Sequence, residues 1–164
     1  MLRDKSLIPL SHQHQHALAL CVRIERASPI PQDDVGAWQE EITQLVQSEI
    51  ALHFAAEEQI VFPAAEKFEQ LSALVKQLMF EHANLRTMFT KTQEDGLSSN
   101  EILVLARSLS AHVRTEERLL FERMQQLLSN EELGVLGSKL QSVLKDSEEA
   151  CRLPSATTRL RPAK

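Results

Sequence analysis

Apolar residues recur every three or four positions along most of this chain, which is the spacing that lines one face of an α-helix. In the first such stretch they fall at Ala17, Leu20, Cys21 and Ile24. The pattern predicts one helix from residue 11 to 27, three longer helices at 34–62, 66–92 and 100–128, and a shorter helix at 131–146.

Turn-forming residues mark the expected ends of the first two helices. Ser11 is a candidate N-cap for the first helix, and Asp33 or Asp34 for the second, which follows a loop at 28–34. Pro63 is expected to end or kink the second helix, because proline cannot donate the backbone hydrogen bond that a helix interior needs.

The later boundaries follow from similar signals. The segment 94–100 predicts a turn, because it contains Gly96 among small polar residues. Ser129 and Asn130 break the fourth helix, and Asn130 is a candidate cap for the short fifth helix.

Four long amphipathic helices with short connections favour an up-down-up-down four-helix bundle. A length of 164 residues suits one domain, and a hydrophobic fraction of 43% is enough for a packed core. Good helix formers dominate, and aromatic residues make up only 4% of the chain. We therefore predict an all-α protein, with a bundle and a short C-terminal helix over residues 1–150 and a flexible tail over 151–164.

Charge and cysteine content exclude several classes of protein. The net charge of −5 and the absence of a basic stripe along the helices argue against nucleic-acid binding. Cys21 and Cys151 could form one disulfide at most, so they are more simply interpreted as reduced thiols. No secretory signal or membrane-spanning run is apparent, which predicts a soluble, cytoplasmic protein without membrane partners.

A ten-residue pattern, H-x-x-x-E-E-x-x-x-F, occurs twice. The first copy runs from His53 to Phe62 in the second predicted helix, and the second from His112 to Phe121 in the fourth. A single His-x-x-x-Glu is often only a surface hydrogen-bonded pair. Its repetition on alternate helices is much harder to ascribe to chance.

The spacing suggests metal binding. Residues four apart project from one helix face, so His53 with Glu57 and His112 with Glu116 form two pairs of ligands. Imidazole nitrogen and carboxylate oxygen together suit iron, manganese or zinc. The second and fourth helices of such a bundle run parallel, so the two pairs can meet at one depth, where each carboxylate can bridge two metals.

The other two helices offer further histidines. His82 lies among apolar residues at helical spacing in the third helix, and a lone core histidine would usually be only hydrogen bonded. The first helix contains His12, His14 and His16, of which His14 aligns best with the apolar face and His16 is the second choice. Glu58 and Glu117, one position round from the repeated pairs, are expected to contact the ligands or face solvent.

These motifs resemble the hemerythrin-like family with the HHE cation-binding motif. The similarity rests on His53 to Pro63, the second copy from His112, the Leu10–His14 segment and Glu81-His82, and it covers about residues 8 to 128. The resemblance implies a four-helix bundle around a non-heme di-iron centre, with zinc or manganese as alternatives. Its implied ligands are His14, His53, Glu57, His82, His112 and Glu116.

One departure narrows the expected chemistry. Oxygen-carrying hemerythrins have a fifth histidine, but Leu78 and Arg86 lie one turn either side of His82 here. The four-histidine, two-glutamate set resembles the branch that includes iron–sulfur repair proteins, although their extra cysteine-containing N-terminal segment is not found.

We predict a metal-binding protein that binds or senses oxygen, nitric oxide or peroxide, or stores iron. The alternatives are an iron–sulfur cluster repair-type iron donor, a di-iron oxidase, or a structural or sensor module. The lack of tyrosine excludes a tyrosyl radical, and no acid–base pair for an organic substrate is apparent, so a binding protein is favoured over an enzyme. The expected partner is a small diatomic ligand such as oxygen or nitric oxide, and a homodimer is a further candidate assembly.

Overall fold

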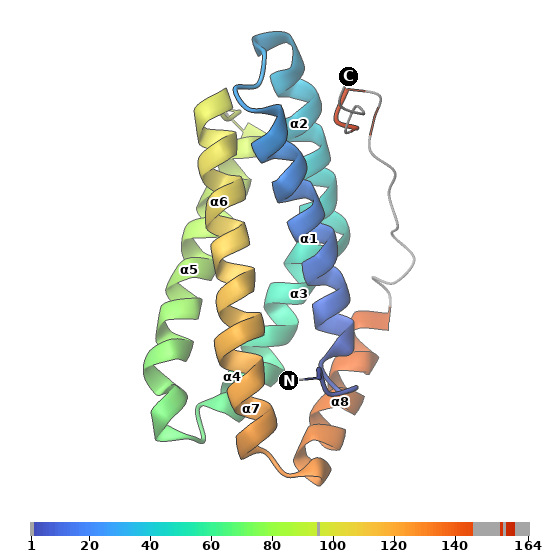
Figure 1. The fold of residues 1–164 in the computed structure, drawn as a ribbon, viewed down its shortest axis with the longest axis vertical. Coiled ribbons are helices and arrows are strands. Elements are labelled where there is room, and N and C mark those ends of the chain that lie inside the picture. The colour runs from blue at the N-terminus through green and yellow to red at the C-terminus, as the bar shows by residue number, and fades with distance from the viewer. Residues whose placement is uncertain (1, 95, 146–154, 156, 160–164) are drawn as a thin grey trace.

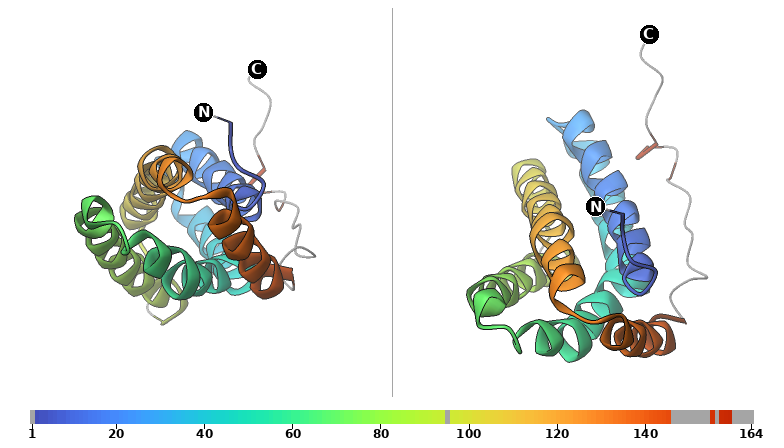
Figure 2. Two further views of the ribbon diagram at one scale, coloured as in Figure 1. Left: turned by 90° about the horizontal axis from the view of Figure 1, so that it is seen from below. Right: turned by 60° about the horizontal axis from the view of Figure 1, so that its bottom comes forward.

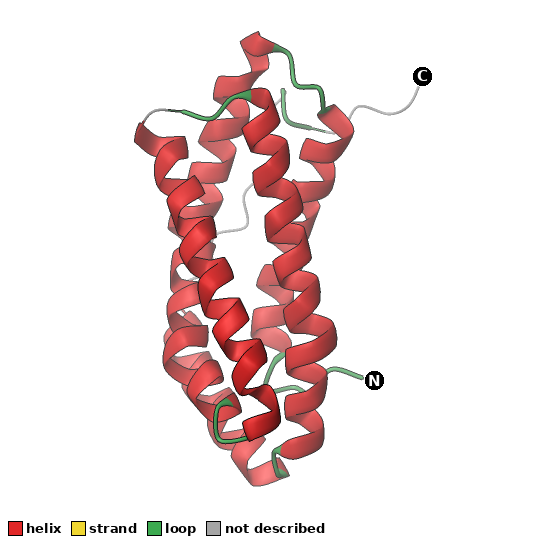
Figure 3. Cartoon of the chain, turned by 90° about the vertical axis from the view of Figure 1, so that its left-hand side faces the viewer, coloured by secondary structure: helices red, strands yellow, loops and turns green. Residues whose placement is uncertain are grey.

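The protein is a helical bundle, as Figure 1 shows for the computed structural model. The residues described are 2–94, 96–145, 155 and 157–159. Their regular structure is entirely helical, without strands (Figure 3). The first helix is α1 (Ile8–Ala27) and the third is α5 (Glu69–Glu94). This confirms the predicted all-α class.

The second and fourth helices are continuous series of segments. The second comprises α2 (Gln32–Leu45), η1 (Val46–Ile50), α3 (Ala51–Ala56), η2 (Glu57–Val61) and α4 (Phe62–Ala65). The fourth comprises α6 (Ser99–Thr115), η3 (Glu116–Leu120) and α7 (Phe121–Leu127). The η segments are single π-helical turns, which are wider than α-helical turns.

Successive long helices run in opposite directions, so α2–α4 and α6–α7 are parallel to each other (Figure 1). Seen from below, the four helices surround a common centre (Figure 2). The short helix α8 (Asn130–Leu144) lies outside this ring, where it contacts α1, α3 and η2. Among the described residues, no helix is both long and apolar enough to cross a membrane.

The interior contains two apolar cores, one toward each end of the bundle. One core includes Ile24, Trp38 and Ile102, and the other includes Phe62 and Leu140. On each long helix the residues of one core give way to those of the other within a few turns. Polar side chains can therefore be buried at the boundary without dividing either core.

Several predicted helix boundaries were wrong by a few residues. Helix α1 begins at Ile8 with Leu7 at the N-cap position, so Ser11 lies inside it. The second helix begins at Gln32 with Pro31 at its N-cap position, which places Asp33 and Asp34 in its first turn. Acidic groups there are favoured by the positive end of the helix dipole, so Asp33 and Asp34 do mark a helix N-terminus, but the predicted cap lies two or three residues after the observed one.

The cap of the short fifth helix is also corrected. Ser129, and not Asn130, is its N-cap, since the Ser129 hydroxyl accepts from the backbone N–H of Glu132. The Glu132 carboxylate accepts in return from the backbone N–H of Ser129, which completes a capping box. The predicted end at Asp146 lies outside the described residues.

Pro63 does not end its helix at Phe62. It is the second residue of α4, which continues to Ala65. The preceding π turn already interrupts the usual i to i−4 hydrogen-bond ladder, so the missing proline N–H is tolerated there.

The N-terminal segment and α8 approach each other closely. A Cβ at Gly137 would lie 2.7 Å from the Cβ of Ser6, so only glycine allows this contact without a shift.

Of the tail predicted over 151–164, residue 155 and residues 157–159 are described, and the carbonyl of the buried Thr158 accepts a hydrogen bond from Arg23. The rest of that segment, Cys151 included, lies outside the described residues.

Candidate metal centre

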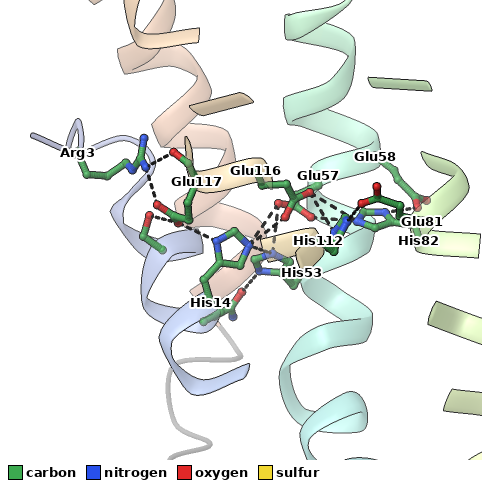
Figure 4. A network of polar contacts seen from close by, with 12 residues as sticks. Arg3, His14, His53, Glu57, Glu58, Glu81, His82, His112, Glu116 and Glu117 are labelled. Atoms are coloured by element: carbon green, nitrogen blue, oxygen red, sulfur yellow. Dashed lines mark hydrogen bonds and ion pairs between the residues drawn. The ribbon is translucent and has the colours of Figure 1, made fainter. Parts of the chain in front are cut away.

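Six polar side chains from the four long helices meet at the boundary between the two cores (Figure 4). None is more than 4% exposed. They form two overlapping groups, and in each group one nitrogen or oxygen atom per residue lies within 4.8 Å of the others. The groups are His14, His53, Glu57 and Glu116, and His82, His112, Glu57 and Glu116.

We call these groups the α1 half-site, which contains His14 and His53, and the α5 half-site, which contains His82 and His112. Both half-sites share the same two carboxylates. The structure thus brings together all six residues that the resemblance implied. Of the two candidates on α1, His14 lies in the cluster, whereas the half-exposed side chain of His16 pairs with Glu49 at 2.9 Å.

Each shared carboxylate presents one oxygen to each half-site. Glu57 Oε1 lies 3.2 Å from Nε2 of His53, while Glu57 Oε2 lies 3.4 Å from Nε2 of His82. Glu116 mirrors this arrangement, with Oε2 at 3.2 Å from His14 Nε2 and Oε1 at 3.2 Å from His112 Nε2. An approximate two-fold axis between the parallel helices therefore relates the two half-sites.

A π turn begins at each shared glutamate. The backbone N–H of Phe62 donates to the carbonyl of Glu57, five residues earlier, and that of Phe121 donates to Glu116 in the same way. Both phenylalanines are buried, and their ring centroids lie 5.3 Å from that of His82 for Phe62 and 5.6 Å from that of His14 for Phe121. The duplicated sequence motif thus folds into a duplicated local structure, and such turns are frequent at functional sites.

Most of the donor atoms lack other hydrogen-bond partners, the exceptions being Nε2 of His14 and Nε2 of His53, which lie 2.9 Å apart. Within the described residues, both oxygens of Glu57 and of Glu116 are buried without a hydrogen bond, as is Nε2 of His82 and of His112. Burying such groups unpaired is unfavourable by several kcal/mol in order of magnitude. A cation bound between them would satisfy these atoms, so the residues fit a metal.

The second glutamate of each motif reaches a histidine on a neighbouring helix. His14 Nδ1 donates to Glu117 Oε1 at 2.7 Å, and His82 Nδ1 donates to Glu58 Oε1 at 2.8 Å. These contacts leave each Nε2 directed at the cluster. Glu58 and Glu117 were expected either to contact the histidines or to face solvent. Each does both, since it contacts a histidine of the cluster while about a quarter of its side chain is exposed.

The remaining two histidines bind residues of α1 and α5. His53 Nδ1 donates to Gln13 Oε1 at 2.8 Å, and His112 Nδ1 donates to Glu81 Oε2 at 2.8 Å. The sequence analysis assigned no role to Gln13. The signal was available, because Gln13 precedes His14 as Glu81 precedes His82.

An arginine accompanies each second glutamate. Arg3 donates to Glu117 Oε2 at 2.5 Å, and Arg86 donates to Glu58 Oε1 at 2.6 Å. Arg86 lies at the position where oxygen-carrying hemerythrins would have a fifth histidine, and here it pairs with the Glu58 carboxylate. The role of Arg3 could not be read from periodicity, because it precedes the first helix.

The cluster shifts the pKa values of its own groups. Burial lowers the pKa of His14, but its interactions with the Glu116 and Glu117 carboxylates outweigh this effect and raise the pKa to about 9. Burial also lowers the pKa of His112, yet the nearby negative charge of Glu116 outweighs this effect and raises the pKa to about 10. Burial disfavours the Glu57 carboxylate, but His53 holds its pKa well below the usual range. In the metal-free protein His14 and His112 are therefore protonated at neutral pH, and a cation must displace the protons to bind.

Space and packing differ between the half-sites. A cavity of about 10 Å³, enough for one water-sized molecule, lies beside His14, His53 and His112, and Phe54 and Val113 also line it. Phe54, the counterpart of Val113 in the first motif, lies face to face with His82 at 3.7 Å between ring centroids. Phe54 and Val113 thus both line the cavity, and the Phe54 ring also packs against His82 of the α5 half-site.

Buried nitrogen and oxygen donors without other partners, held between the helices of a bundle, define a metal-binding protein. The family model for the hemerythrin HHE cation binding domain matches residues 9–124. The chain therefore belongs to the hemerythrin HHE cation-binding family. Comparison with curated proteins and with solved structures gives no match.

Proposed function

We propose that the cluster holds a non-heme di-iron centre and that this centre binds or senses a small molecule, with oxygen or nitric oxide as the main candidates. The observation that carries the proposal is the pair of shared carboxylates. Glu57 and Glu116 each direct one oxygen at each half-site, which is the disposition needed to bridge two cations.

Binding of a further small ligand favours iron over zinc. Each half-site offers two imidazole nitrogens and two carboxylate oxygens. Four protein donors complete the tetrahedral shell that zinc usually adopts, whereas six-coordinate iron keeps positions open for a further ligand. A reduced iron pair would supply the electrons and open positions that diatomic gases require.

The size of the cavity favours a diatomic ligand over an organic substrate. Its volume of about 10 Å³ beside His14 and His53 suits a molecule the size of water. Burial of all six donors disfavours the alternative role of an iron donor, because release would require the bundle to open. We therefore favour ligand binding over iron delivery, and a small-molecule partner over nucleic acid or membrane.

Metal analysis of anaerobically reconstituted protein tests the di-iron centre. We expect two ferrous ions per chain and a change in the visible absorption spectrum when oxygen or nitric oxide is added. Fewer than two tightly bound ions would contradict the proposal. Restoration of a damaged iron–sulfur protein is the assay that would instead support the repair alternative.

A substitution in the cavity tests ligand binding separately from metal binding. Val113→Phe should fill the space beside His14 and His53, so the iron content stays at two while ligand binding slows. Val104→Phe is the matched control, because Val104 lies on the same helix with 53% exposure. Ligand binding by Val113→Phe at the rate of the control would argue against this cavity as the binding site.

A further inference from the structure

The residues that accept a hydrogen bond from Nδ1 of the four histidines are related by the same approximate two-fold axis as the histidines themselves. Each histidine of α1 or α5 donates to the second glutamate of a motif, as His14 does to Glu117. Each motif histidine donates to the residue before the histidine of α1 or α5, as His53 does to Gln13. At this last position the symmetry fails, because the counterpart of Gln13 is Glu81.

This difference leaves one carboxylate without an arginine or lysine partner. Glu117 is paired with Arg3 and Glu58 with Arg86, so these two outer carboxylates are matched in charge. Glu81 instead accepts from the neutral amide of Gln77 at 2.7 Å. Among the described residues, no arginine or lysine forms an ion pair with Glu81.

A carboxylate and an amide affect a coordinating imidazole differently. A carboxylate that accepts from Nδ1–H increases electron density on the ring, so Nε2 becomes a stronger metal ligand. A neutral amide oxygen fixes the same ring orientation with a weaker effect. Glu49 is another buried carboxylate on the α1 side, but it contacts His16 and not a histidine of the cluster.

We propose that Glu81 and Gln13 make the two half-sites unequal, so that the α5 half-site binds its ion first and more tightly. This inference rests on the proposed two-metal centre. Glu81 and Gln13 act as positioning residues with different charge: both orient a histidine, but only Glu81 strengthens it as a ligand. The α1 half-site, beside the cavity, is then the weaker metal position.

Reciprocal substitutions of nearly equal shape test the proposal. Metal-free protein is titrated with ferrous iron, and anaerobic calorimetry measures each binding step. Glu81→Gln should weaken the first binding step by about 10–100-fold, the range usual for such outer partners. Gln13→Glu should tighten the second step by a similar factor and change the first step little. It adds a charge without removing a hydrogen-bond acceptor, so it tests the claim even if Glu81→Gln folds poorly.

Matched controls separate this effect from the overall charge of the protein. Glu69→Gln removes the same charge from α5 about three turns away, and Gln15→Glu adds one to an exposed position of α1. Neither should change either binding step. Equal effects in the controls and the test variants would overturn the proposal.

The site of the first ion provides a second measurement. After one equivalent of ferrous iron, proton NMR should show paramagnetically shifted imidazole N–H signals from His82 and His112. The double variant Gln13→Glu/Glu81→Gln should transfer these shifts to His14 and His53. Two bound ions with no transfer would overturn this inference alone, whereas fewer than two bound ions would overturn the di-iron proposal as well.

Discussion

The two half-sites have the same donors but different surroundings. In both, an imidazole from a motif and one from a neighbouring helix face the shared Glu57 and Glu116. Around the α5 half-site, Glu81 and the ring of Phe54 pack against the histidines. Around the α1 half-site, Gln13 takes the place of Glu81, and Val113 is the sequence counterpart of Phe54.

This comparison shows which feature each part of the sequence controls. The duplicated motif supplies the equal inner donors, and its second glutamates supply equal outer partners. The inequality comes from Gln13 and Glu81, which lie outside the motifs, and from Val113 and Phe54 at a variable motif position. The repeated motif thus gives two positions with the same donors, and a few side chains around them make the two positions different.

Removal of a shared carboxylate should abolish metal binding at both half-sites. Glu57→Ala or Glu116→Ala takes a donor from both half-sites at once, so we expect metal content to fall from two ions to well below one per chain. Metal analysis after gel filtration is the measurement. Glu49→Ala is the control, since Glu49 is equally buried but outside the cluster, and a comparable loss there would point to general unfolding.

Removal of one histidine should separate the half-sites. His82→Ala should leave one ion in the α1 half-site, and His14→Ala one ion in the α5 half-site, because each substitution affects a single group. The ion retained by His14→Ala should be the tighter one in calorimetry. His12→Ala, at an exposed position of α1, should keep both ions. Loss of both ions from His14→Ala would show that the half-sites fill only together.

Acid should weaken metal binding at both half-sites. His14 and His112 have pKa values of about 9 and about 10 in the metal-free protein, so at pH 7 an entering cation must displace a proton from each. Affinity should therefore rise with pH by up to about tenfold per unit for each proton released, and level off above pH 10. Calorimetry in buffers of different ionisation enthalpy counts the protons. A pH-independent affinity between pH 7 and 9 would contradict this.

Stability of the metal-free protein should change with pH in the opposite direction. The raised pKa values of His14 and His112 contribute stability that is fully present below the ordinary histidine pKa of 6.5. This contribution is lost as pH rises through about 9 and about 10. Urea unfolding from pH 6.5 to 10 measures it, and a rise in the free energy of unfolding over that range would contradict the assignment.

The smallest expected effect concerns the two arginines. Arg3→Gln should alter the α1 half-site more than Arg86→Gln alters the α5 half-site, because the Arg3 side chain is 19% exposed and that of Arg86 is 46% exposed. Solvent and salt screen the more exposed pair. We expect changes in metal affinity of severalfold or less, measured in low and high salt. A larger effect from Arg86→Gln would mean that exposure does not rank these pairs.

Much of this architecture could be predicted because it follows from helical periodicity. The pattern of Ala17, Leu20, Cys21 and Ile24 predicted a buried face of α1, and these residues are buried. Exact ends could not be predicted, because Ser11 and Asn130 resemble caps in sequence while the chain uses positions 7 and 129. The π turns were also missed, because helical periodicity does not indicate where a turn takes an extra residue.

The amino-acid sequence by itself determined the all-α class and the two His-x-x-x-Glu pairs, since both depend only on spacing along a helix. It favoured His14 and His82 as inward-facing residues, but only the structure decided between His14 and His16. Only the tertiary structure decided which residue holds each imidazole, because these partners are 24 to 103 residues apart in the chain. It likewise decided that the half-sites differ, because Gln13 and Glu81 become counterparts only after four helices pack around one axis.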